Sequence, residues 1–562
     1  MAASLVFRLH DGAPELVREV LLERGWEEYD GEEQEEEDWN LYWRVSAFRH
    51  SEYLKLLPWQ RLNHHPKSVG ITRKDYLARN LRRMRATFGS SLYNFSPMAF
   101  ILPNDYTRFI AEYTKQRLTR GLSGYWICKP VDLSRGRGIF IFCDIKDLIY
   151  DSPVIVQRYI SNPLLISGYK FDLRIYVCVK SFHPLTVYMH QEGLVRFATE
   201  KYNLSTLDNL YAHLTNTSIN KCGPFYTTNK ERVGQGCKWT MSKFRYFLHS
   251  QDVNELLLWQ KIKNIVTLTI LTIAPSVPSS PNCVELFGFD ILIDSTYKPW
   301  LLEVNYSPAL TLDCQADVAV KKGLISDLID LMNYRAIDRL RGRAYQRPKS
   351  SKQPCRNALN PILGSHSRIT RAKVSRERHP SLASYLTDNR ALNLSDVTNH
   401  DDTVTEREPS EEGDSAKPDI SQEGLGSLRS KPAAGPWKLP LEGTRASHRV
   451  ALPPLRVGDF ILTFPFNEAT LEASQHKLDV KLAVQELHKL TSQLASGPSR
   501  LDKNKLRRQE EEVKTDEGVR TCDSDEGFES LFWGPKEPPL LCIGCFLSEK
   551  YKSQSIKSDT QN

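Results

Sequence analysis

Polar and apolar side chains alternate strictly in the stretch 168–179 (GYKFDLRIYVCV), which predicts a β-strand. Lys170, Asp172, Arg174 and Tyr176 share one face of this strand, and the apolar residues between them share the other, because successive side chains point to opposite faces. A strand with one face in solvent explains this pattern. A charged wall that borders a bound ligand explains it as well, and both interpretations stay open at this point.

Two further strands are predicted at 284–293 (VELFGFDILI) and 300–305 (WLLEVN), and the turn residues between them suggest an antiparallel hairpin. If Ile293 pairs with Trp300, then Asp290 lies directly opposite Glu303. Gly288 then lies opposite Asn305 on the same face.

Two opposed carboxylates should repel each other, since directly paired Cβ atoms are about 4.5–5.5 Å apart. A divalent cation reverses the sign of that interaction, and hard oxygen ligands favour Mg²⁺. We therefore expect a magnesium site at Asp290, Glu303 and Asn305, with Gly288 leaving room for the ion. The alternative is that Asp290 merely ends a strand and that Glu303 pairs with a Lys or Arg.

A phosphate site is predicted upstream, where strand-like runs at 125–130 and 138–144 flank the loop VDLSRGRG (131–138). Gly136 and Gly138 allow the backbone N–H groups of such a loop to approach phosphates closely. Lys129, late in an apolar strand, needs an anion when buried. If the alternating strand faces a nucleotide, Lys170 and Arg174 meet its phosphates, and Asp172 orients them or bonds a ribose.

The composition changes near residue 345. Residues 1–345 are dense in aromatic residues and alternate between predicted strands and helices, whereas 346–562 are rich in Ser, Pro, Glu and Lys. We expect most of this tail to be disordered. Two stretches interrupt it, a Phe-rich one at 457–469 and one at 477–494, whose Val480, Val484, Leu487 and Leu494 recur at helical spacing and suggest a docking or minor core face.

The formal net charge is +7, and basic residues concentrate at 335–378, where thirteen Lys and Arg stand against two acidic residues. Such an arm is commonly solvated, and a polyanion is its expected partner when it has one. The N-terminus lacks the apolar run of a signal peptide, and the longest apolar run, 265–275, is too short to span a bilayer. We therefore expect a cytosolic protein without a membrane segment. The eleven cysteines, including the CxxC pair Cys542 and Cys545, are interpreted as inert thiols.

Several long motifs together resemble the tubulin–tyrosine-ligase-like family, and within it the glutamylating branch. They are NHHPKSVGITRKD (63–75), QRYISNPLLISGYKFDLRIYV (157–177), HLTNTSINK (213–221), FGFD (287–290) and LLEVNYSP (301–308). The resemblance covers about residues 20–335. It implies an α+β fold with an ATP-grasp-type ligase core at 1–345, made of N-terminal (1–70), central (71–165) and C-terminal (166–345) lobes. The basic arm and the largely disordered tail (346–562), with its short amphipathic segments, would follow this core.

The resemblance also implies an activity, a tubulin polyglutamylase that uses ATP and Mg²⁺. Such an enzyme joins free L-glutamate to γ-carboxylates in the acidic C-terminal tails of tubulin, through an acyl phosphate. It implies a monomer in the cytoplasm and on the cytoskeleton, with the cilium, flagellum or basal body as further places.

By motif match the resemblance assigns three sets of site residues. ATP would be held by Lys74, Lys129, Arg135, Gly136, Arg137, Gly138, Ile139, Gln157, Arg158, Tyr159, Ile160, Lys170, Asp172, Thr215 and Asn216. Mg²⁺ would be bound by Asp290, Glu303 and Asn305, with Arg174 and Glu303 as catalytic residues. Free glutamate would be received by Arg196, Thr217, Ser218, Lys221 and Lys321, with Arg196 suited to a bidentate grip on the α-carboxylate.

Thr217 departs from the family pattern, which commonly has Tyr at this position beside the amino-acid pocket. This departure and the basic arm motivate a second hypothesis, a catalytically weak microtubule-binding protein of the same fold. Nucleic-acid binding rests on the arm alone and is disfavoured, because interleaved aromatic residues and groove-reading motifs are missing.

Overall fold

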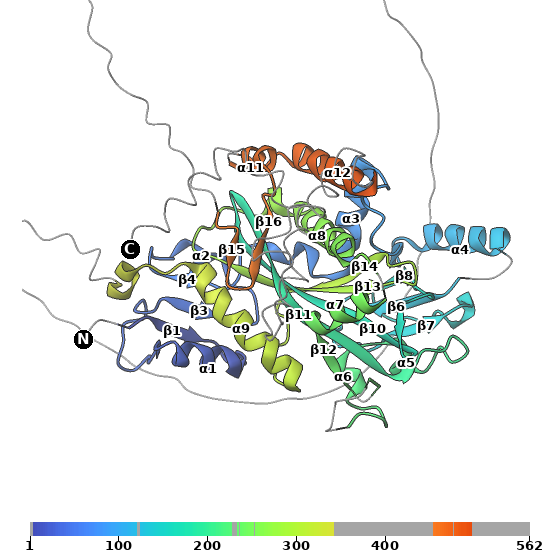
Figure 1. Ribbon diagram of the computed structural model, residues 1–562, viewed down its shortest axis with the longest axis horizontal. Helices are drawn as coiled ribbons and strands as arrows, with labels where there is room; N and C mark the ends of the chain where they lie inside the picture. The colour runs from blue at the N-terminus through green and yellow to red at the C-terminus, as the bar shows by residue number, and fades with distance from the viewer. Residues whose placement is uncertain are drawn as a thin grey trace, which may run out of the picture. The chain divides into compact units, whose positions relative to one another are not determined.

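The structure is a computed structural model, and it describes residues 4–120, 124–227, 233–234, 236–251, 253–341, 453–475 and 477–496. All of these residues belong to one compact unit. Within them the fold mixes helices with three separate sheets (Figure 1).

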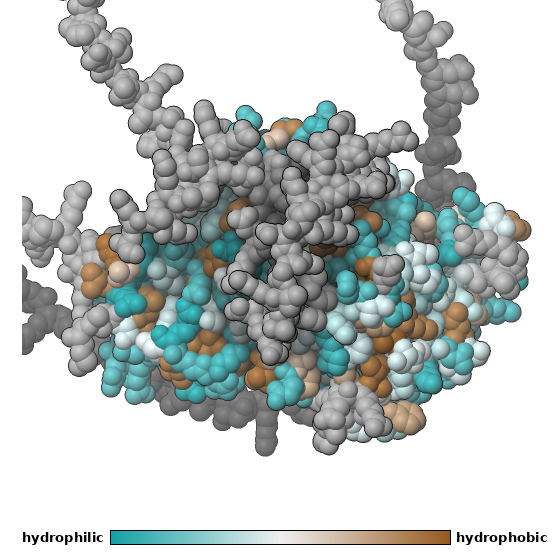
Figure 2. Space-filling view, in the orientation of Figure 1, coloured by the Kyte–Doolittle hydropathy of each residue, from teal (hydrophilic) through white to brown (hydrophobic). Residues whose placement is uncertain are grey.

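The first sheet is N-terminal and has the strand order β2-β1-β3-β4, with all neighbours parallel. Its apolar core includes aromatic residues such as Trp39, Tyr42 and Phe48. The elements of this region are β1 (Val6–Leu9), α1 (Glu15–Glu23), β2 (Glu27–Glu28), β3 (Leu41–Trp43), α2 (His50–Leu54), β4 (Arg61–Leu62) and the 3₁₀ turn η1 (Ser68–Ile71). Helix α1 buries Leu16, Val17, Val20 and Leu21 and leaves its charged face outside, where hydrophilic residues gather at the lower left of Figure 2.

The second sheet is antiparallel, with the order β5-β8-β6-β7, and packs around Phe109, Trp126 and Phe142. It carries Lys129 near the end of β6 and Gln157 near the end of β8, which faces Ile127 across the ladder. The elements are α3 (Lys74–Phe88), β5 (Ala99–Leu102), α4 (Tyr106–Arg120), β6 (Trp126–Pro130), β7 (Phe140–Phe142), η2 (Ile145–Asp147) and β8 (Val154–Arg158).

The third sheet is the largest and has the order β14-β13-β10-β11-β16-β15, with β9 paired to β10 and β12 paired to β11. Its strands are β9 (Leu165–Ile166), β10 (Tyr169–Phe182), β11 (Leu185–Lys201), β12 (Lys238–Thr240), β13 (Glu285–Ile293), β14 (Pro299–Asn305), β15 (Arg456–Val457) and β16 (Phe460–Phe464). Its helical elements are α5 (Leu210–His213), α6 (Thr217–Asn220), α7 (Met241–Ser250), α8 (Glu255–Leu271), η3 (Ala274–Ser276), α9 (Gln315–Met332), η4 (Ala336–Leu340), α11 (Glu468–Gln475) and α12 (Val480–Ser496).

Strand β10 is covered on both faces, and this decides between the two interpretations of its alternating sequence. The apolar residues Phe171, Leu173 and Ile175 pack into one core cluster, which also contains the buried face of α8. Lys170, Asp172 and Arg174 are buried as well, each less than 8% exposed. The hypothesis of a strand with one face in solvent is therefore wrong, and the charged face lies inside the protein.

Part of the expected tail belongs to the folded unit. Strand β16 pairs antiparallel with β11, with Phe460 opposite His190 and Phe464 opposite Val187. Helix α12 packs on α8 near the top of Figure 1, where Asn264 donates a hydrogen bond to Thr491 at 3.0 Å. Val484 and Leu487 are buried in the main core, which confirms the predicted core face. The folded unit therefore extends beyond the expected end at residue 345.

The three sheets follow the order of the expected lobes along the chain, but the lobes themselves and their boundaries stay a prediction. The basic arm lies outside the described residues from position 342 to its end at 378, as do Cys542 and Cys545. Its first residues are part of the fold, since Arg341 binds Asp38 and the carbonyl of Ser4. Cys128, Cys178 and Cys283 are buried, and Cys143 is partly buried.

One segment within the described residues, Glu255–Ser276, is long and apolar enough to cross a membrane by length and composition. It contains α8, and 83% of its apolar window is buried inside the protein. A helix at the centre of a core has the same composition, and α8 occupies that position here.

We predict that Phe460→Ala lowers the free energy of unfolding by about 3–5 kcal/mol, because Phe460 is fully buried between β11 and the α9 side of the sheet. Leu455→Ala is the matched control, since Leu455 is 37% exposed and should lose little. Chemical denaturation of both variants checks this. Equal stability of the two would show that the tail strand does not contribute to the fold.

Candidate functional site

A cavity of about 280 Å³ lies between the second and third sheets. Its walls come from β6 and β8 on one side and from β10, β13 and β14 on the other. The loop 133–136 and the segment 213–216 close its ends. Most of the residues predicted to hold ATP and metal line it, namely Lys74, Lys129, Arg135, Gly136, Ile139, Gln157, Arg158, Tyr159, Ile160, Lys170, Asp172, Thr215, Asn216, Asp290, Glu303 and Asn305.

The hairpin β13–β14 places two acids opposite each other, as predicted. Asp290 pairs with Glu303, and Gly288 pairs with Asn305. The assumed pair of Ile293 and Trp300 is wrong, because Ile293 faces Pro299 instead. A register shift between Asp290 and Ile291 corrects the count, since β14 has one extra residue there.

The two acids have different electrostatic surroundings. Asp290 is 2% exposed, and Arg174 grips it with Nε at 2.6 Å and Nη2 at 3.1 Å, while Arg196 Nη2 lies 2.8 Å from it. Burial opposes its ionisation, but these two arginines outweigh burial and hold the pKa of Asp290 below its ordinary value. Asp290 is therefore a stable anion.

Glu303 has no ion pair within the described part of the chain and faces the negative charge of Asp290. Burial and that neighbouring charge raise the pKa of Glu303 above its ordinary value. The carboxyl group would gain from a cation placed between it and Asp290. This is the electrostatic condition for a divalent metal site.

Asn305 completes the set of oxygen ligands. Its Nδ2 donates a hydrogen bond to the carbonyl of Gly288 at 3.1 Å, which leaves its side-chain oxygen available. Gly288 itself does not leave room for the ion as expected. A Cβ there would lie 3.0 Å from Cδ of Arg174 and 2.9 Å from Cβ of Pro308, so the missing side chain makes room for the arginine.

Two lysines approach the acids from the second sheet and from α3. Lys129 donates to the side-chain oxygen of Gln157 at 2.8 Å, and Lys74 donates to the carbonyl of Leu133 at 2.5 Å. Burial lowers the pKa of both lysines, and the negative charge of Glu303 partly opposes this. Among the described residues no carboxylate forms an ion pair with either lysine, so both suit an anionic ligand.

Lys170 is the most strongly perturbed lysine of the cavity. Its Nζ donates to the hydroxyl of Tyr159 at 2.9 Å and to the carbonyl of His213 at 2.8 Å, and both partners are uncharged oxygens. Burial lowers its pKa to about 7. A phosphate group brought into the cavity would restore the charge of Lys170.

The glycine loop packs on α6. Gly136 has φ of +78°, and a Cβ there would lie 2.0 Å from Cδ1 of Ile219. The hydroxyl of Ser218 donates to the carbonyl of Arg135 at 3.1 Å. Arg137 and Gly138 belong to the same loop but do not line the cavity, and Arg137 contacts the carbonyl of Ser134.

Arg196 differs from the expectation in its contacts. It binds both oxygens of Asp172, through Nε at 2.8 Å and through Nη2. In this structure Arg196 therefore makes its bidentate contact with Asp172 and not with a ligand. Asp172 is in turn occupied by the arginine and is not free to bind a ribose. Asp172 lines the cavity and Arg196 does not, so the role of Arg196 in holding glutamate stays a prediction.

A cluster of three lysines and two acids lies around the start of α9, and we call it the lysine cluster. Lys221 and Lys238 both bind Asp313, at 2.8 and 3.2 Å, and Lys238 and Lys321 both bind Asp317 at 2.7 Å. It unites two of the residues predicted to receive glutamate, Lys221 and Lys321. Thr217 and Ser218 stand on α6, one turn before Lys221.

The sequence interpretation missed Lys238, Asp313 and Asp317. Lys238 lies opposite Arg196 in the β11–β12 ladder, and its side chain is only 6% exposed. Strand β12, which carries Lys238, is only three residues long and shows little periodicity. Its pairing with β11 could therefore not be predicted from the sequence. The spacing of Asp317 and Lys321, four residues apart on a helix, was visible and suggests an ion pair.

The motif NHHP (63–66) packs against the chain at the end of β14. His64 contacts Glu285 through Nδ1 at 2.6 Å, and the other carboxylate oxygen of Glu285 accepts from the backbone of His65 and the hydroxyl of Ser68. The ring of His64 stacks on Tyr306, with centroids 4.1 Å apart. This network fixes the chain directly after Asn305.

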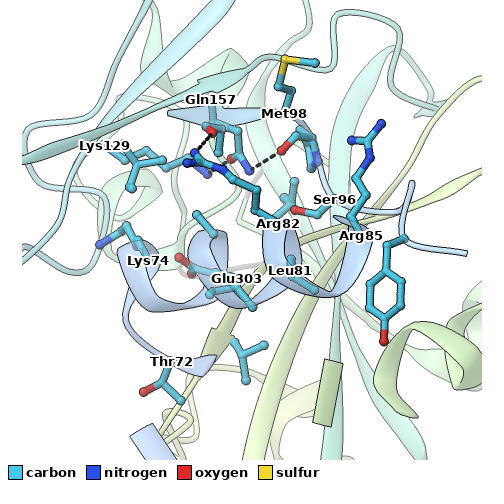
Figure 3. Close-up of a pocket in the computed structure, with 18 residues that line it drawn as sticks. Thr72, Lys74, Leu81, Arg82, Arg85, Ser96, Met98, Lys129, Gln157 and Glu303 are labelled. Atoms are coloured by element: carbon cyan, nitrogen blue, oxygen red, sulfur yellow. Dashed lines mark hydrogen bonds between the residues drawn. The ribbon is translucent and has the colours of Figure 1, made fainter. Parts of the chain in front are cut away.

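A second cavity of about 110 Å³ adjoins the first and shares Lys74, Lys129, Gln157 and Glu303 with it (Figure 3). Helix α3 lines it with Leu81, Arg82 and Arg85. Figure 3 shows Lys74 and Glu303 close to each other, with the hydrogen bond from Lys129 to Gln157 above them. Glu303 therefore borders both cavities.

The sequence model of the tubulin-tyrosine ligase family matches residues 50–339 of this chain, a range that contains every predicted site residue. The chain belongs to this family. The family resemblance of the sequence motifs is thereby confirmed.

Among members of the tubulin-tyrosine ligase family, the probable tubulin polyglutamylase TTLL2 of Homo sapiens is 50% identical over 517 residues, covering 86% of this chain and 84% of that protein. The protein of the same name from Mus musculus is 47% identical over 508 residues, covering 86% and 92%. The tubulin polyglutamylase TTLL5 of Homo sapiens is 38% identical over 345 residues, covering 59% of this chain and 26% of that protein.

We predict that the two acids of the hairpin respond in opposite ways to the same chemical change in metal-free buffer. Glu303→Gln should raise the free energy of unfolding by about 1 kcal/mol, because it removes the repulsion with Asp290. Asp290→Asn should lower it by about 3–5 kcal/mol, because two buried arginines lose their shared partner. Denaturant unfolding in EDTA measures both. A loss of stability in both variants would contradict the proposed charge imbalance.

Proposed function

We propose that this protein is a tubulin polyglutamylase, an ATP- and Mg²⁺-dependent ligase that joins glutamate to γ-carboxylates of glutamate residues in tubulin C-terminal tails. Two relatives that each cover 86% of this chain carry that activity in their names. The observation that carries the proposal is the opposed pair of Asp290 and Glu303 at the floor of a cavity whose other walls are cationic. This pattern suits a metal–triphosphate ligand.

The chain's own groups fit that ligand. Asp290, Glu303 and Asn305 would hold Mg²⁺, since their oxygens are hard ligands, and Oδ1 of Asp290 keeps a lone pair beyond its contact with Arg174, whereas Oδ2 contacts both arginines. Lys74, Lys129 and Lys170 would hold phosphates. The segment 157–160, at the end of β8, would border the base. The magnesium nucleotide, when bound, supplies the phosphoryl group that activates the acceptor carboxylate.

The protein's part in the reaction is alignment and charge neutralisation. The acceptor γ-carboxylate would attack the terminal phosphorus of ATP and become an acyl phosphate as ADP leaves, and the amine of free glutamate would then displace phosphate to form the amide. Arg174, which already lies beside Asp290, would neutralise the negative charge that develops on the phosphoryl group during its transfer. A nucleophile from the protein is not needed.

We place the donor glutamate at the lysine cluster and Arg196. A glutamate carries two carboxylates and one amine. Lys221, Lys238 and Lys321 exceed Asp313 and Asp317 by one positive charge, which matches the net charge of the donor. The acids would then exchange their lysines for the ammonium group of the donor. Thr217 and Ser218 would border it from α6.

We expect the acceptor to be an acidic peptide, because the chain carries a formal net charge of +7 and a basic arm. Cytoplasm and cytoskeleton are the proposed sites of action, with the protein as a monomer. The basic arm would strengthen contact with the microtubule, although it lies outside the described residues from position 342 onward.

The decisive test is incubation of the full chain with unmodified tubulin, ATP, Mg²⁺ and glutamate, followed by mass analysis of the tubulin tails. We predict added glutamate units with the unchanged protein and none with Glu303→Gln. Glu52→Gln is the matched control, because Glu52 pairs with Arg44 on the N-terminal sheet, away from the cavity. It should keep full activity.

Two outcomes would contradict the proposal. If the Glu303→Gln variant adds glutamate to tubulin at the unchanged rate, Glu303 is not a ligand of the catalytic metal. Cosedimentation with microtubules without any turnover by the unchanged protein would favour the second hypothesis, a catalytically weak microtubule-binding protein.

We predict that the protein takes up a proton at Lys170 when it binds the nucleotide. In the free protein Lys170 has a pKa of about 7 and is mostly neutral at about pH 8. Anionic phosphates would favour its charged form, so affinity should fall as the pH rises from 7 toward the ordinary lysine value of 10.5. Calorimetry at about pH 8 in buffers of different ionisation enthalpy measures the uptake. Lys170→Met should abolish it, and uptake unchanged in that variant would contradict the assignment.

A further inference from the structure

A second group of metal-binding side chains lies away from the cavity, where the tail strand joins the sheet. It consists of His190 on β11, Asp327 on α9 and Asp459 in the turn between β15 and β16, and we call it the His190 cluster. One ligand atom from each residue lies within 4.8 Å of the other two. Asp459 thus meets residues that precede it by more than a hundred positions.

His190 points an unsatisfied nitrogen into this group. The side chain is 2% exposed, and its ring packs edge to face on Phe460. Within the described part of the chain, Nε2 is buried without a hydrogen-bond partner. The nearest acid oxygen, Oδ2 of Asp327, is 3.5 Å away, beyond a good hydrogen bond.

The other ring nitrogen has two contacts with the backbone of Glu192, and they require opposite tautomers of the histidine. Nδ1 lies 2.9 Å from the carbonyl oxygen of Glu192, to which it can donate, and the backbone N–H of Glu192 donates to Nδ1 at 3.2 Å. A metal ion at Nε2 requires the tautomer with the proton on Nδ1, which donates to the carbonyl of Glu192 at the shorter distance and leaves a lone pair on Nε2. A lone pair aimed at a carboxylate is repulsive unless a cation lies between them. Metal-bound histidines commonly donate their second N–H to a backbone carbonyl in this way.

The turn around Asp327 is built to a close fit. Gly458 has φ of +56°, and a Cβ there would lie 2.1 Å from Cγ of Asp327. The backbone N–H of Asp459 donates to Oδ2 of Asp327 at 2.7 Å, and Arg456 binds Oδ1 of Asp459 at 2.7 Å. One oxygen of each acid remains available. With Arg456 counted, the group carries one net negative charge, which a divalent cation would reverse.

We propose that His190, Asp327 and Asp459 bind a divalent transition-metal ion, with Zn²⁺ as the best match, and that this ion fastens the tail segment 453–475 to the ligase core. One imidazole nitrogen and two carboxylate oxygens are ligands that Zn²⁺ accepts, with water in the fourth position. The site is separate from the hairpin acids and does not depend on the proposed function. Binding there stabilises the joined form by mass action.

The test uses the full chain carrying Glu303→Gln, so that the hairpin site is weakened. After dialysis against EDTA, the protein is titrated with ZnCl₂ by calorimetry, and bound zinc is counted after gel filtration. We expect one saturable equivalent and a zinc-dependent rise in Tm. His190→Gln should lose both, and Asp459→Asn, a change at a partly exposed residue, should weaken zinc binding at least about tenfold.

Asp330→Asn is the matched control. Asp330 lies on α9, the helix of Asp327, and faces Arg24, and its substitution removes one negative charge, as Asp459→Asn does. The Asp330→Asn variant should bind zinc like the parent. The Tm of each variant without zinc reports whether it folds. Saturable zinc retained in His190→Gln and Asp459→Asn would overturn the proposal, as would a parent that takes up no zinc, in which case Nε2 would carry a proton shared with Asp327.

Discussion

Two carboxylates of like charge are held opposite each other on neighbouring strands, and the pair is only partly neutralised. Asp290 is gripped by Arg174 and approached by Arg196, whereas Glu303 has open space on two sides and no ion pair within the described residues. In isolation this arrangement is unfavourable, since burial and repulsion both act against the charge of Glu303. A cation of higher charge removes the conflict. The site is therefore arranged for a ligand rather than for stability.

Much of the surrounding structure maintains this arrangement. The long strands β10 and β11 bring Asp172 to the cavity and hold Arg174 and Arg196 against Asp290 and Asp172, and both faces of β10 are covered by core. The network of His64 and Glu285 fixes the chain after Asn305. The tail strand β16 extends the same sheet at β11. Restricted movement of these strands keeps the opposed acids from turning apart.

The sequence predicted the parts of the site that depend on local periodicity. Strand alternation placed Lys170, Asp172 and Arg174 on one face, and counting along the hairpin paired Asp290 with Glu303 even though the assumed turn register was off by one residue. A bulge compensated for that error, and no periodicity reveals a bulge. The family motifs identified residues from the second and third sheets and from α3 that line one cavity.

What the sequence did not predict depends on contacts between distant elements. The bidentate grip of Arg196 on Asp172 required the register of β10 and β11, and Lys238 required that of β11 and β12. The tail strand β16 follows a long polar segment, so composition alone assigned it to the tail. Gly288 was interpreted as space for an ion, but the side chain that fills the space, Arg174, comes from another strand. Packing between elements decided each of these points.

The central claim is that Asp290 and Glu303 share one metal ion beside the phosphates of a nucleotide. A crystal structure with Mg²⁺ and a non-hydrolysable ATP analogue tests it most directly. The account predicts an ion about 2.0–2.1 Å from an oxygen of each acid, with phosphate oxygens completing its coordination and Lys74, Lys129 and Lys170 around the phosphates. A nucleotide bound elsewhere, or an ion that leaves Glu303 uncoordinated, would contradict it.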